Sequence, residues 1–547
     1  MRRAVWVVVV AVAGSLTAGC YVYDPLWCKT SADCEDLPTR PYCDTTGEHE
    51  PNGIANTCVP DPGETPPPGT LSITVPDGPH YLQREGSLEI DLQVTREQVD
   101  APVRITVSNL PDGVSAQPLN IPSSMVTGKL LLTATRSAVV GVTSLSLHAT
   151  AGTTIADDRD LPLEIIGVPG ELDTTFGTEG TGIVTFPDLP DGAAGLVKVL
   201  PQGDQAILVL PGPLITRVRA DGSLDRSFGA DGRAQVAVDA IGISAVNRYE
   251  VIIDSAGRIV LVGSGPVASG GSDTDLFMVR FTADGQLDPA LPPLRLDSHD
   301  GQQTIYALRA APGGRVFVLG DDAPAMGSSI TMVRRFNEAG RLDWPFGRQE
   351  LPDISAYVGV AQRDGRIVLN RNGRMIRRKV DGEADPSFGN GGETVLPIDK
   401  GRAAWKLAES LPNGDMIVAG DADRTRRVLW RLHGNGTVDT TFGNLGYQDI
   451  ETPDSQSLER AIAIWASGGL IYGIDNIIDY HTGGMKVRIF RLTEAGEQDL
   501  TFGENGVSLD PDPFKNFASA AVLERHRVLA AGSGRNQKGV MLRRYWY

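Results

Sequence analysis

The sequence of 547 residues predicts an all-β protein with a seven-bladed β-propeller, a closed ring of repeats, in residues 168–547. Three observations predict this fold. A turn followed by Asp recurs seven times at an average spacing of about 54 residues, and a short apolar run follows each copy about 30 residues later. The two ends of the array also complement each other. A period of this length is typical of folds in which each unit buries its apolar face against its neighbours.

The first repeated element is Asp-x-x-Phe-Gly after a turn. In the third copy, Asp288 is followed by Pro-Ala-Leu and departs from this pattern. We interpret the motif as structural, because a group present in nearly every unit serves every unit. The Phe would fill the gap between units, and the Gly would adopt a positive φ. The six full copies contain Asp173 and Phe176, Asp225 and Phe228, Asp343 and Phe346, Asp385 and Phe388, Asp439 and Phe442, and Asp499 and Phe502.

Two further elements recur in each unit. Runs such as GRIVLVG at Gly257 and GDMIVAG at Gly414 are rich in Val, Ile and Leu, and are typical of buried strands too short for amphipathic helices. The element before each Asp mixes apolar residues with Arg, which predicts an outer strand with one solvent-facing side. The Arg that lies eight residues before its Asp is Arg217, Arg280, Arg335, Arg377, Arg431 or Arg491, with Arg544 as a seventh that has no following Asp.

The recurring Arg and Asp have two interpretations. They could form a ring of charge that binds a ligand, or each Arg could pair with its own Asp and hold a turn between units. Their recurrence favours the structural role.

The ends of the array predict closure. The array opens with the Asp motif and no Arg strand, and it closes with an Arg strand and no Asp motif. The first segment can therefore complete the last unit, which removes exposed sheet edges. Each unit has room for four strands. A linear β-solenoid is the alternative, but it would not need complementary ends.

The copies resemble the delta-60 repeat family of large bacterial proteins. This resemblance covers residues 168–547 and rests on two elements, LDxxFG and the DGRIVLVG type, which alternate in register. It implies a repeat fold and no established chemistry.

The first residues predict export and a lipid anchor. Residues 1–19 have two arginines, a short apolar stretch and small residues before Cys20, as in a secretory signal. The run LTAGC resembles a bacterial lipobox, although Thr17 stands where Leu is usual, so we expect lipidation at Cys20. Ordinary signal cleavage is the alternative.

A small Cys-rich module is predicted in residues 20–58, followed by a Pro-rich linker in residues 59–70. In an exported chain, four cysteines favour two disulfides, with three possible pairings. Zinc is the weaker alternative, because no CxxC pair is present and His49 is the only nearby His. The four are Cys28, Cys34, Cys43 and Cys58.

Residues 71–167 predict an immunoglobulin-like β-sandwich. Six alternating runs bounded by turn residues read as strands, from LSITV to DLPLEIIGV. The phrase SNLPDGVSA resembles a turn of bacterial immunoglobulin-like domains, whose usual role is spacing or adhesion.

The sequence lacks the common catalytic signatures HExxH, GxSxG and the Walker loop. Its seven histidines form no spaced ligand set, and the runs DSHDG and SDTD lack the full spacing of a calcium loop, so we expect no metal and no cofactor. Insertions break the period at residues 264–275 and 474–485, and the second carries Tyr480 and His481, a speculative ligand-contact pair on a loop.

A net charge of −18 argues against nucleic-acid binding. Together with the signal, the lipobox and the order of the domains, this leads us to expect a monomeric outer-membrane lipoprotein of the bacterial cell envelope, periplasmic or surface-facing. We expect it to present the propeller as a binding scaffold for an unknown protein or glycan ligand. The alternatives are a polysaccharide lyase or hydrolase, by analogy of fold alone, and a purely structural envelope protein.

Overall fold

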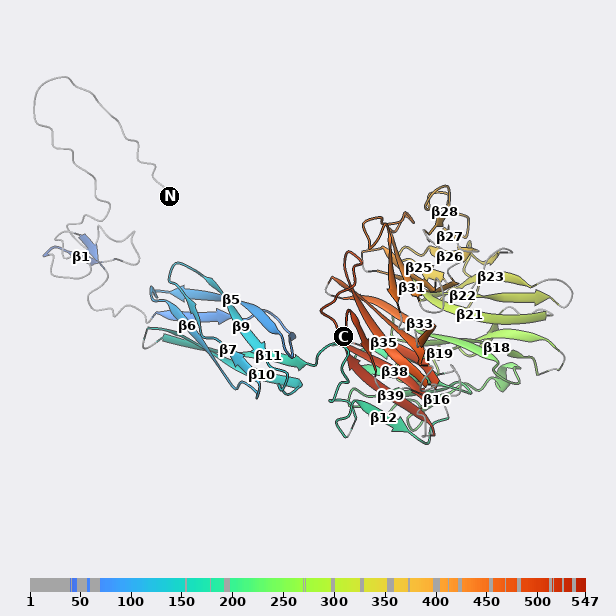
Figure 1. Ribbon diagram of the computed structural model, residues 1–547, viewed down its shortest axis with the longest axis horizontal. Helices are drawn as coiled ribbons and strands as arrows, with labels where there is room; N and C mark the ends of the chain where they lie inside the picture. The colour runs from blue at the N-terminus through green and yellow to red at the C-terminus, as the bar shows by residue number, and fades with distance from the viewer. Residues whose placement is uncertain are drawn as a thin grey trace, which may run out of the picture.

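The computed structural model has an all-β fold (Figure 1). A short 3-10 turn, η3 (Asp239–Ile241), is the helical element of the part that is described. Within that part, no helix is long and apolar enough to cross a membrane. The described residues are 40, 42–46, 57–59, 69–152, 155–177, 179–190, 197–268, 270, 272–296, 301–324, 329–351, 359–371, 374–396, 404–411, 413–421, 426–451, 456–467, 469–479, 484–510, 514, 516–523, 526–533 and 538–547.

A two-stranded pair stands before the first large sheet. Strand β1 (Tyr42–Asp44) runs antiparallel to β2 (Thr57–Val59), with Cys43 directly opposite Cys58. Both cysteines are buried, and each is disulfide-bonded. Cys20, Cys28 and Cys34 lie outside the described residues, so the lipid anchor and the pairing of the four cysteines in two disulfides stay predictions.

Two sheets packed face to face follow the Pro-rich segment. Their strands alternate buried and exposed side chains, and the buried ones, such as Ile90 and Leu147, form one shared core. All six strands expected here are present, and three short ones, β4, β7 and β8, were not predicted. One sheet has the order β3 (Thr70–Thr74), β5 (Ser87–Glu97), β9 (Thr127–Ala134) and β7 (Val114–Ala116); the other has the order β4 (His80–Gln83), β11 (Ile155–Ile166), β10 (Gly141–Ala151), β6 (Val103–Ser108) and β8 (Leu119–Ile121).

The repeats form antiparallel sets of four strands. Two sets are joined by a single parallel bridge, Thr274 to Gln302, into one eight-stranded sheet. In chain order the sets are β13 (Lys198–Gln202), β14 (Gln205–Leu210), β15 (Leu214–Val218) and β16 (Arg233–Gln235); β17 (Arg248–Ile253), β18 (Ile259–Pro266), β19 (Thr274–Phe281) and β20 (Leu294–Leu296); β21 (Gly301–Ala311), β22 (Arg315–Pro324), β23 (Ile330–Phe336) and β24 (Arg348–Glu350); β25 (Gly359–Ala361), β26 (Ile367–Arg371), β27 (Arg374–Arg378) and β28 (Glu393–Val395); β29 (Ala404–Ser410), β30 (Met416–Asp421), β31 (Arg426–Leu432) and β32 (Tyr447–Glu451); and β33 (Gln456–Ser467), β34 (Leu470–Asp479), β35 (Gly484–Thr493) and β36 (Val507–Leu509).

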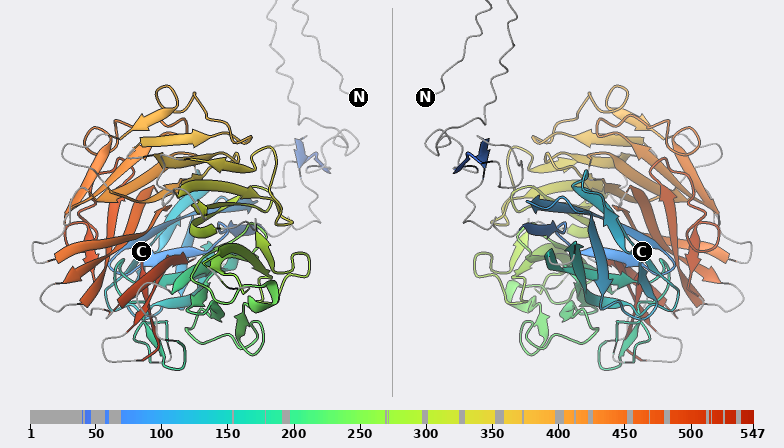
Figure 2. Two further views of the ribbon diagram at one scale, coloured as in Figure 1. Left: turned by 90° about the vertical axis from the view of Figure 1, so that its right-hand side faces the viewer. Right: turned by 90° about the vertical axis from the view of Figure 1, so that its left-hand side faces the viewer.

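The last set is completed by the first segment of the array. Its strands are β37 (Asn516–Leu523), β38 (Arg527–Ser533) and β39 (Val540–Trp546), and β12 (Ile183–Phe186) pairs with β39 as the fourth. The first strand of each set contacts the first strand of the next, and β37 contacts β13. Figure 2 shows the sets following one another around a common centre. Most apolar clusters of the ring lie between neighbouring sets, as between Leu208 and Leu529.

The Arg-bearing strand is the third of each set, and the expectation of an outer strand with one wet face is wrong. The outer position belongs to the short fourth strands, and β19 and β39 are buried along nearly their whole length. Arg280 and Arg544 are only 3% and 2% exposed. The mixture of apolar residues and Arg suggested a solvent-facing side, but the Arg charges are neutralised inside the fold and do not face water.

The sandwich meets the ring where third strands end and the Asp motifs lie, which we call the motif face. Arg527 donates from Nη2 to Oε1 of Glu164 at 2.8 Å, and the rings of Tyr81 and His526 meet edge to face at 4.7 Å. Gly167 is required at this joint, because a Cβ there would lie 2.2 Å from the indole of Trp546. In Figure 1 the sandwich lies beside the end of the ring that carries the C label.

Candidate functional site

Five of the motif Asp residues are held by the Arg of their own copy. The backbone N–H of the Asp donates to the carbonyl of that Arg, as from Asp225 to Arg217 at 2.9 Å. This bond folds the eight-residue segment back so that the two side chains meet. The Nε–Oδ2 distance is 2.8 Å for Arg217–Asp225, 2.7 Å for Arg280–Asp288, 2.7 Å for Arg335–Asp343, 2.8 Å for Arg377–Asp385 and 2.8 Å for Arg491–Asp499.

The fifth internal copy is arranged differently. Arg431 lies 2.9 Å from Asp415 and 3.5 Å from Asp439. Asp415 stands where four other turns carry an Arg, namely Arg258, Arg315, Arg366 and Arg527. The Arg is therefore shared between two carboxylates in this copy.

At the seam of the ring, the pair is formed between the two ends of the array. Arg544 Nε donates to Asp173 Oδ2 at 2.7 Å, and Arg527 Nε donates to the same oxygen at 2.9 Å. Asp173 is fully buried, and Arg527 also holds Glu164 of the sandwich. One buried carboxylate thus joins the first repeat, the last repeat and, through Arg527, the sandwich.

The motif Phe packs between its own Arg and the next turn. The guanidinium carbon of Arg377 lies 4.9 Å from the centre of the Phe388 ring. On the other side, Gly436 has φ +89°, and a Cβ there would lie 2.5 Å from the ring. In the divergent third copy, Leu291 is buried at the Phe position and packs against Gly340, so the substitution preserves the contact between units.

The motif carboxylates are stabilised in their charged form. Asp225 has a pKa well below its usual range, held there by the Ser227 hydroxyl first and by Arg217 and Arg219. For Asp385, burial raises the pKa, but hydrogen bonds from Ser387 and Arg377 outweigh it and the pKa is lowered. Anions with saturated hydrogen bonds and lowered pKa values hold structure and are poor acids or bases near neutral pH.

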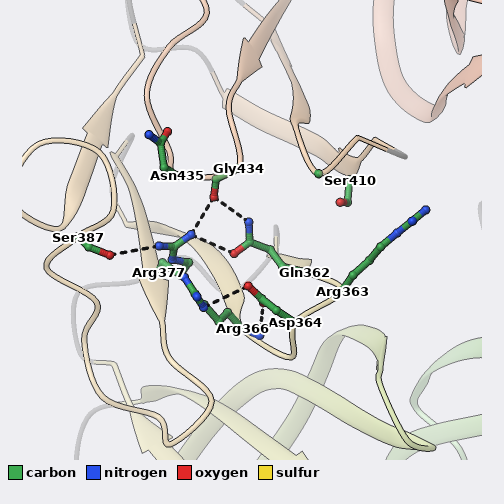
Figure 3. Close-up of a pocket in the computed structure, with 10 residues that line it drawn as sticks. Gln362, Arg363, Asp364, Arg366, Arg377, Ser387, Ser410, Gly434 and Asn435 are labelled. Carbon is green, nitrogen blue, oxygen red and sulfur yellow. Dashed lines mark hydrogen bonds and ion pairs between the residues drawn. The ribbon is translucent and has the colours of Figure 1, made fainter.

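A cavity of about 580 Å³ opens on the motif face between the fourth and fifth sets (Figure 3). Its floor is bonded to the scaffold. Arg377 and Gln362 both donate to the carbonyl of Gly434, at 2.8 and 3.1 Å, and Arg366 pairs with Asp364 at 3.1 Å. The cavity is lined by Gln362, Arg363, Asp364, Arg366, Arg377, Ser387, Ser410, Gly414, Gly434 and Asn435.

Some polar groups of this cavity are not used by the scaffold. Figure 3 shows Arg363 extended away from Arg377, and within the described residues its side chain has no ion pair or hydrogen bond. Asn435 accepts from the backbone and hydroxyl of Thr437 through Oδ1, which leaves its amide N–H donors available. These groups can bind a polar ligand, and none of them forms a nucleophile–base pair.

The structure brings together the predicted Arg, Asp and Phe residues. Tyr480 and His481 lie outside the described residues. Within the part described, no cluster of His, Cys, Asp and Glu could hold a metal ion. Sequence reasoning missed the cavity. Arg363 gave a usable signal, because turns of equal length carry no Arg at that position but Ser255, Pro312, Pro412, Ser467 and Glu524.

Comparison with known proteins supports the repeat fold. The model of a family described as a domain of unknown function (DUF5122) beta-propeller matches residues 257–290 and 411–442. These segments run through the apolar second strands and Asp motifs of the second and fifth sets. No curated protein matches the chain at a significant level.

Solved structures resemble the chain only distantly. The extracellular domain of a hybrid two-component system from B. thetaiotaomicron has 10% identity and a TM-score of 0.34, covering 80% of this chain; the chain covers 51% of that one. An alpha-L-arabinanase from Penicillium chrysogenum has 11% identity and a TM-score of 0.26, with 64% and 93% covered. A lignostilbene dioxygenase from Pseudomonas brassicacearum has 10% identity and a TM-score of 0.31, with 77% and 95% covered. These likenesses carry no argument about function. The family match and the sheet order together identify the repeats of this chain as those of a β-propeller.

Proposed function

We propose that this protein is an exported, lipid-anchored binding scaffold of the bacterial cell envelope, in which a seven-bladed propeller presents a ligand site. The observation that carries the proposal is the cavity around Arg363 and Asn435, whose free polar groups stand on a rigid floor. The recurring Arg, Asp and Phe residues form ion pairs and packing contacts within the ring and are therefore not available to a ligand. A site assembled on rigid elements, with donors left over, suits binding better than turnover.

The order of the modules supports a tethered scaffold. Lipidation at Cys20, two disulfides in the Cys-rich module, an immunoglobulin-like sandwich of residues 71–167 and delta-60-type repeats in residues 168–547 remain parts of this proposal. The buried joint of Arg527 with Glu164 would hold the propeller in a fixed orientation to the tether. We expect a non-enzymatic monomer without cofactor, whose ligand is a protein or a glycan. The alternatives stay a polysaccharide-active enzyme and a purely structural envelope protein.

The anchor is tested by growing cells that express the full chain with radiolabelled palmitate. We expect label in the wild type and none in Cys20→Ala, with the protein moving from the membrane fraction to the soluble exported fraction. A wild-type protein without label refutes the anchor.

The scaffold role is tested with detergent-solubilised full chain as bait for envelope extracts. Retention of a defined protein or glycan by the wild type, lost in Arg363→Ala and kept in Arg226→Ala, supports it. Arg226 is a suitable control because it belongs to an Asp motif turn and does not line the cavity. Conversion of an envelope polysaccharide by the purified chain contradicts the non-enzymatic assignment.

A further inference from the structure

One Asp motif carries an aromatic residue at a position where the other copies do not. Trp344 follows Asp343, and its side chain is 76% exposed. Its ring lies against Gly347, where a Cβ would come within 3.2 Å of it. The residues that follow the Asp in the other copies are Thr174, Arg226, Pro289, Pro386, Thr440 and Leu500. The exposed indole contributes nothing to packing between units, so its face is available to a partner outside the chain.

Trp344 stands beside a second cavity. The next residue, Pro345, lines a hollow of about 470 Å³ on the motif face, together with Lys379, Val380 and Asp381. Val380 is itself 46% exposed. The apolar surface of this rim is thus small, and it lies next to charged groups.

The two cavities meet. Arg366 and Ser387 line both of them, so the two hollows are adjacent; we call them together, from Pro345 to Asn435, the motif-face groove. Its floor is a set of satisfied charges: Asp385 accepts from Arg377 at 2.8 Å and from Ser387 at 2.6 Å. A ligand therefore meets fixed polar groups that need no rearrangement.

The groups left free along the groove are hydrogen-bonding groups. Arg363 and Asn435 offer N–H donors and Ser410 offers a hydroxyl, whereas Lys379 pairs with Glu383 at 3.4 Å. The charged residues that line it nearly balance, with Arg363, Arg366, Arg377 and Lys379 against Asp364, Asp381 and Asp385. A phosphorylated or strongly acidic ligand would call for a clear excess of cations, and a peptide for a larger apolar surface.

We propose that the motif-face groove binds an oligosaccharide, with the apolar C–H face of one sugar ring on Trp344 and hydroxyls of the following units bonded to Arg363, Asn435 and Ser410. A sugar chain offers an apolar surface for Trp344 and hydroxyls for the polar groups that follow, since each ring has a C–H face and an edge of hydroxyls. Planar amide and guanidinium groups satisfy vicinal hydroxyls well. This inference rests on the proposed binding role and specifies its ligand.

The test uses the full chain in detergent and a panel of neutral hexasaccharides (cello-, chito-, xylo- and arabinohexaose) beside oligogalacturonate. Titration is followed by calorimetry and by tryptophan fluorescence. We expect one of them to bind with Kd in the range of about 0.1–10 mM and to perturb the fluorescence. Trp344→Ala should weaken binding about tenfold, and Arg363→Ala should weaken it severalfold.

Leu500→Ala is the matched control, because Leu500 holds the same position in another copy and is 68% exposed. It should bind like the wild type, and all three variants should keep the wild-type melting temperature because the replaced side chains are exposed. Binding by no member of the panel, or binding unchanged in Trp344→Ala, overturns the inference. Capture of a protein in the bait experiment, without saccharide binding, would keep the scaffold and discard the oligosaccharide.

Discussion

Arg544 donates to the carboxylate of Asp173 across 371 positions of sequence, with 2.7 Å between Nε and Oδ2. Inside the array, the same pair is formed within one unit, eight residues apart, as in Arg217 and Asp225. The seam of the ring therefore uses the same bond as five of the six internal units. Backbone bonds repeat there too, because Asp173 donates its N–H to the carbonyl of Arg544 at 2.8 Å. A second cation, Arg527, also contacts Asp173, as Arg315 contacts Asp343 beside Arg335, but only at the seam do the two partners come from opposite ends of the array.

Asp173→Ala should be strongly destabilising. It leaves two arginines, Arg544 and Arg527, buried without their shared anion, and breaking a buried ion pair from one side costs about 3–5 kcal/mol. The measurement is the free energy of unfolding in urea. Asp439→Ala is the control: Arg431 keeps Asp415 at 2.9 Å, so the loss should be about 1–2 kcal/mol. Equal losses in the two variants would contradict the special role of the seam.

Phe442→Ala should also destabilise the ring, by about 3 kcal/mol or more, because it opens a cavity between the fifth and sixth sets. Phe442 is 1% exposed, and a Cβ on Gly496 would lie 2.5 Å from its ring. The melting temperature and the urea midpoint both report this loss. Leu445→Ala, at a residue 73% exposed, should leave both unchanged. An unaltered melting temperature in Phe442→Ala would remove the packing role.

Acid should unfold the ring over a defined interval. Asp225, Asp288 and Asp499 have pKa values below those of the unfolded chain, which are near about 3.9. The unfolded state therefore binds more protons below that pH, and the stabilisation is complete above about pH 4 and is lost as the pH falls toward the folded pKa values. The urea midpoint should be flat from pH 7 to about 5 and fall steeply below about 4.

The cause of this acid sensitivity can be tested at one copy. The Ser227 hydroxyl is the largest influence that lowers the pKa of Asp225. Ser227→Ala should raise that pKa and make the acid loss shallower, while Ser223→Ala, which touches the exposed Asp221, should have a much smaller effect. Identical acid profiles for wild type and Ser227→Ala would show that the hydroxyl is not responsible.

Mild acid should loosen the joint between sandwich and ring. Burial lowers the pKa of His526, whose ring meets Tyr81 and lies 5.4 Å from the ring of Tyr547, with Glu164 and Arg527 as neighbouring charges. A lowered His pKa means that stabilisation is full above the unfolded value of about 6.5 and declines as the pH falls through the folded pKa. Protease sensitivity of residues 166–170 should therefore rise between about pH 6.5 and 5.

His526→Asn is the control for that experiment. His526 has φ +58°, a conformation that Asn tolerates, and the Asn amide does not titrate in this range. The variant should lose the pH dependence and keep the fold. A pH-dependent cleavage that persists in it would assign the effect to another group.

Much of the ring could be predicted from the sequence because its determinants are local. The eight-residue spacing of Arg280 and Asp288 is the length of one strand end and its return turn, so both residue types recur at fixed offsets. The complementary ends predicted the pairing of β12 with β39. The predicted outer position of the Arg strand was wrong. The Arg charges are neutralised by contacts with other segments, and the alternation of residues along the strand does not reveal these contacts.

Arg363 stands out among the turns of the repeats, but the cavity as a whole could not be predicted, because its walls come from separate turns brought together by the packing of two sets. Arg363 and Asn435 are 72 positions apart in the chain and share no motif. Trp344 is a single departure in a variable position, and only its exposed fraction distinguishes it from a packed aromatic residue. The sequence of one repeat therefore predicts the properties of that unit. Properties that depend on which units lie side by side follow only from the three-dimensional structure.

The seam also determines how the molecule would respond to tension. A pull on the sandwich enters the ring through residues 166–172, directly before the segment that closes it. That segment is held to β39 by four residue pairs, Ile183 to Phe186, and by the Asp173 contacts. Force that entered the ring only along the chain would therefore reach this short pairing of β12 with β39 first. The bond from Arg527 to Glu164 diverts it, because it attaches the sandwich to β38, a strand in the middle of its sheet, and so spreads tension over the whole set.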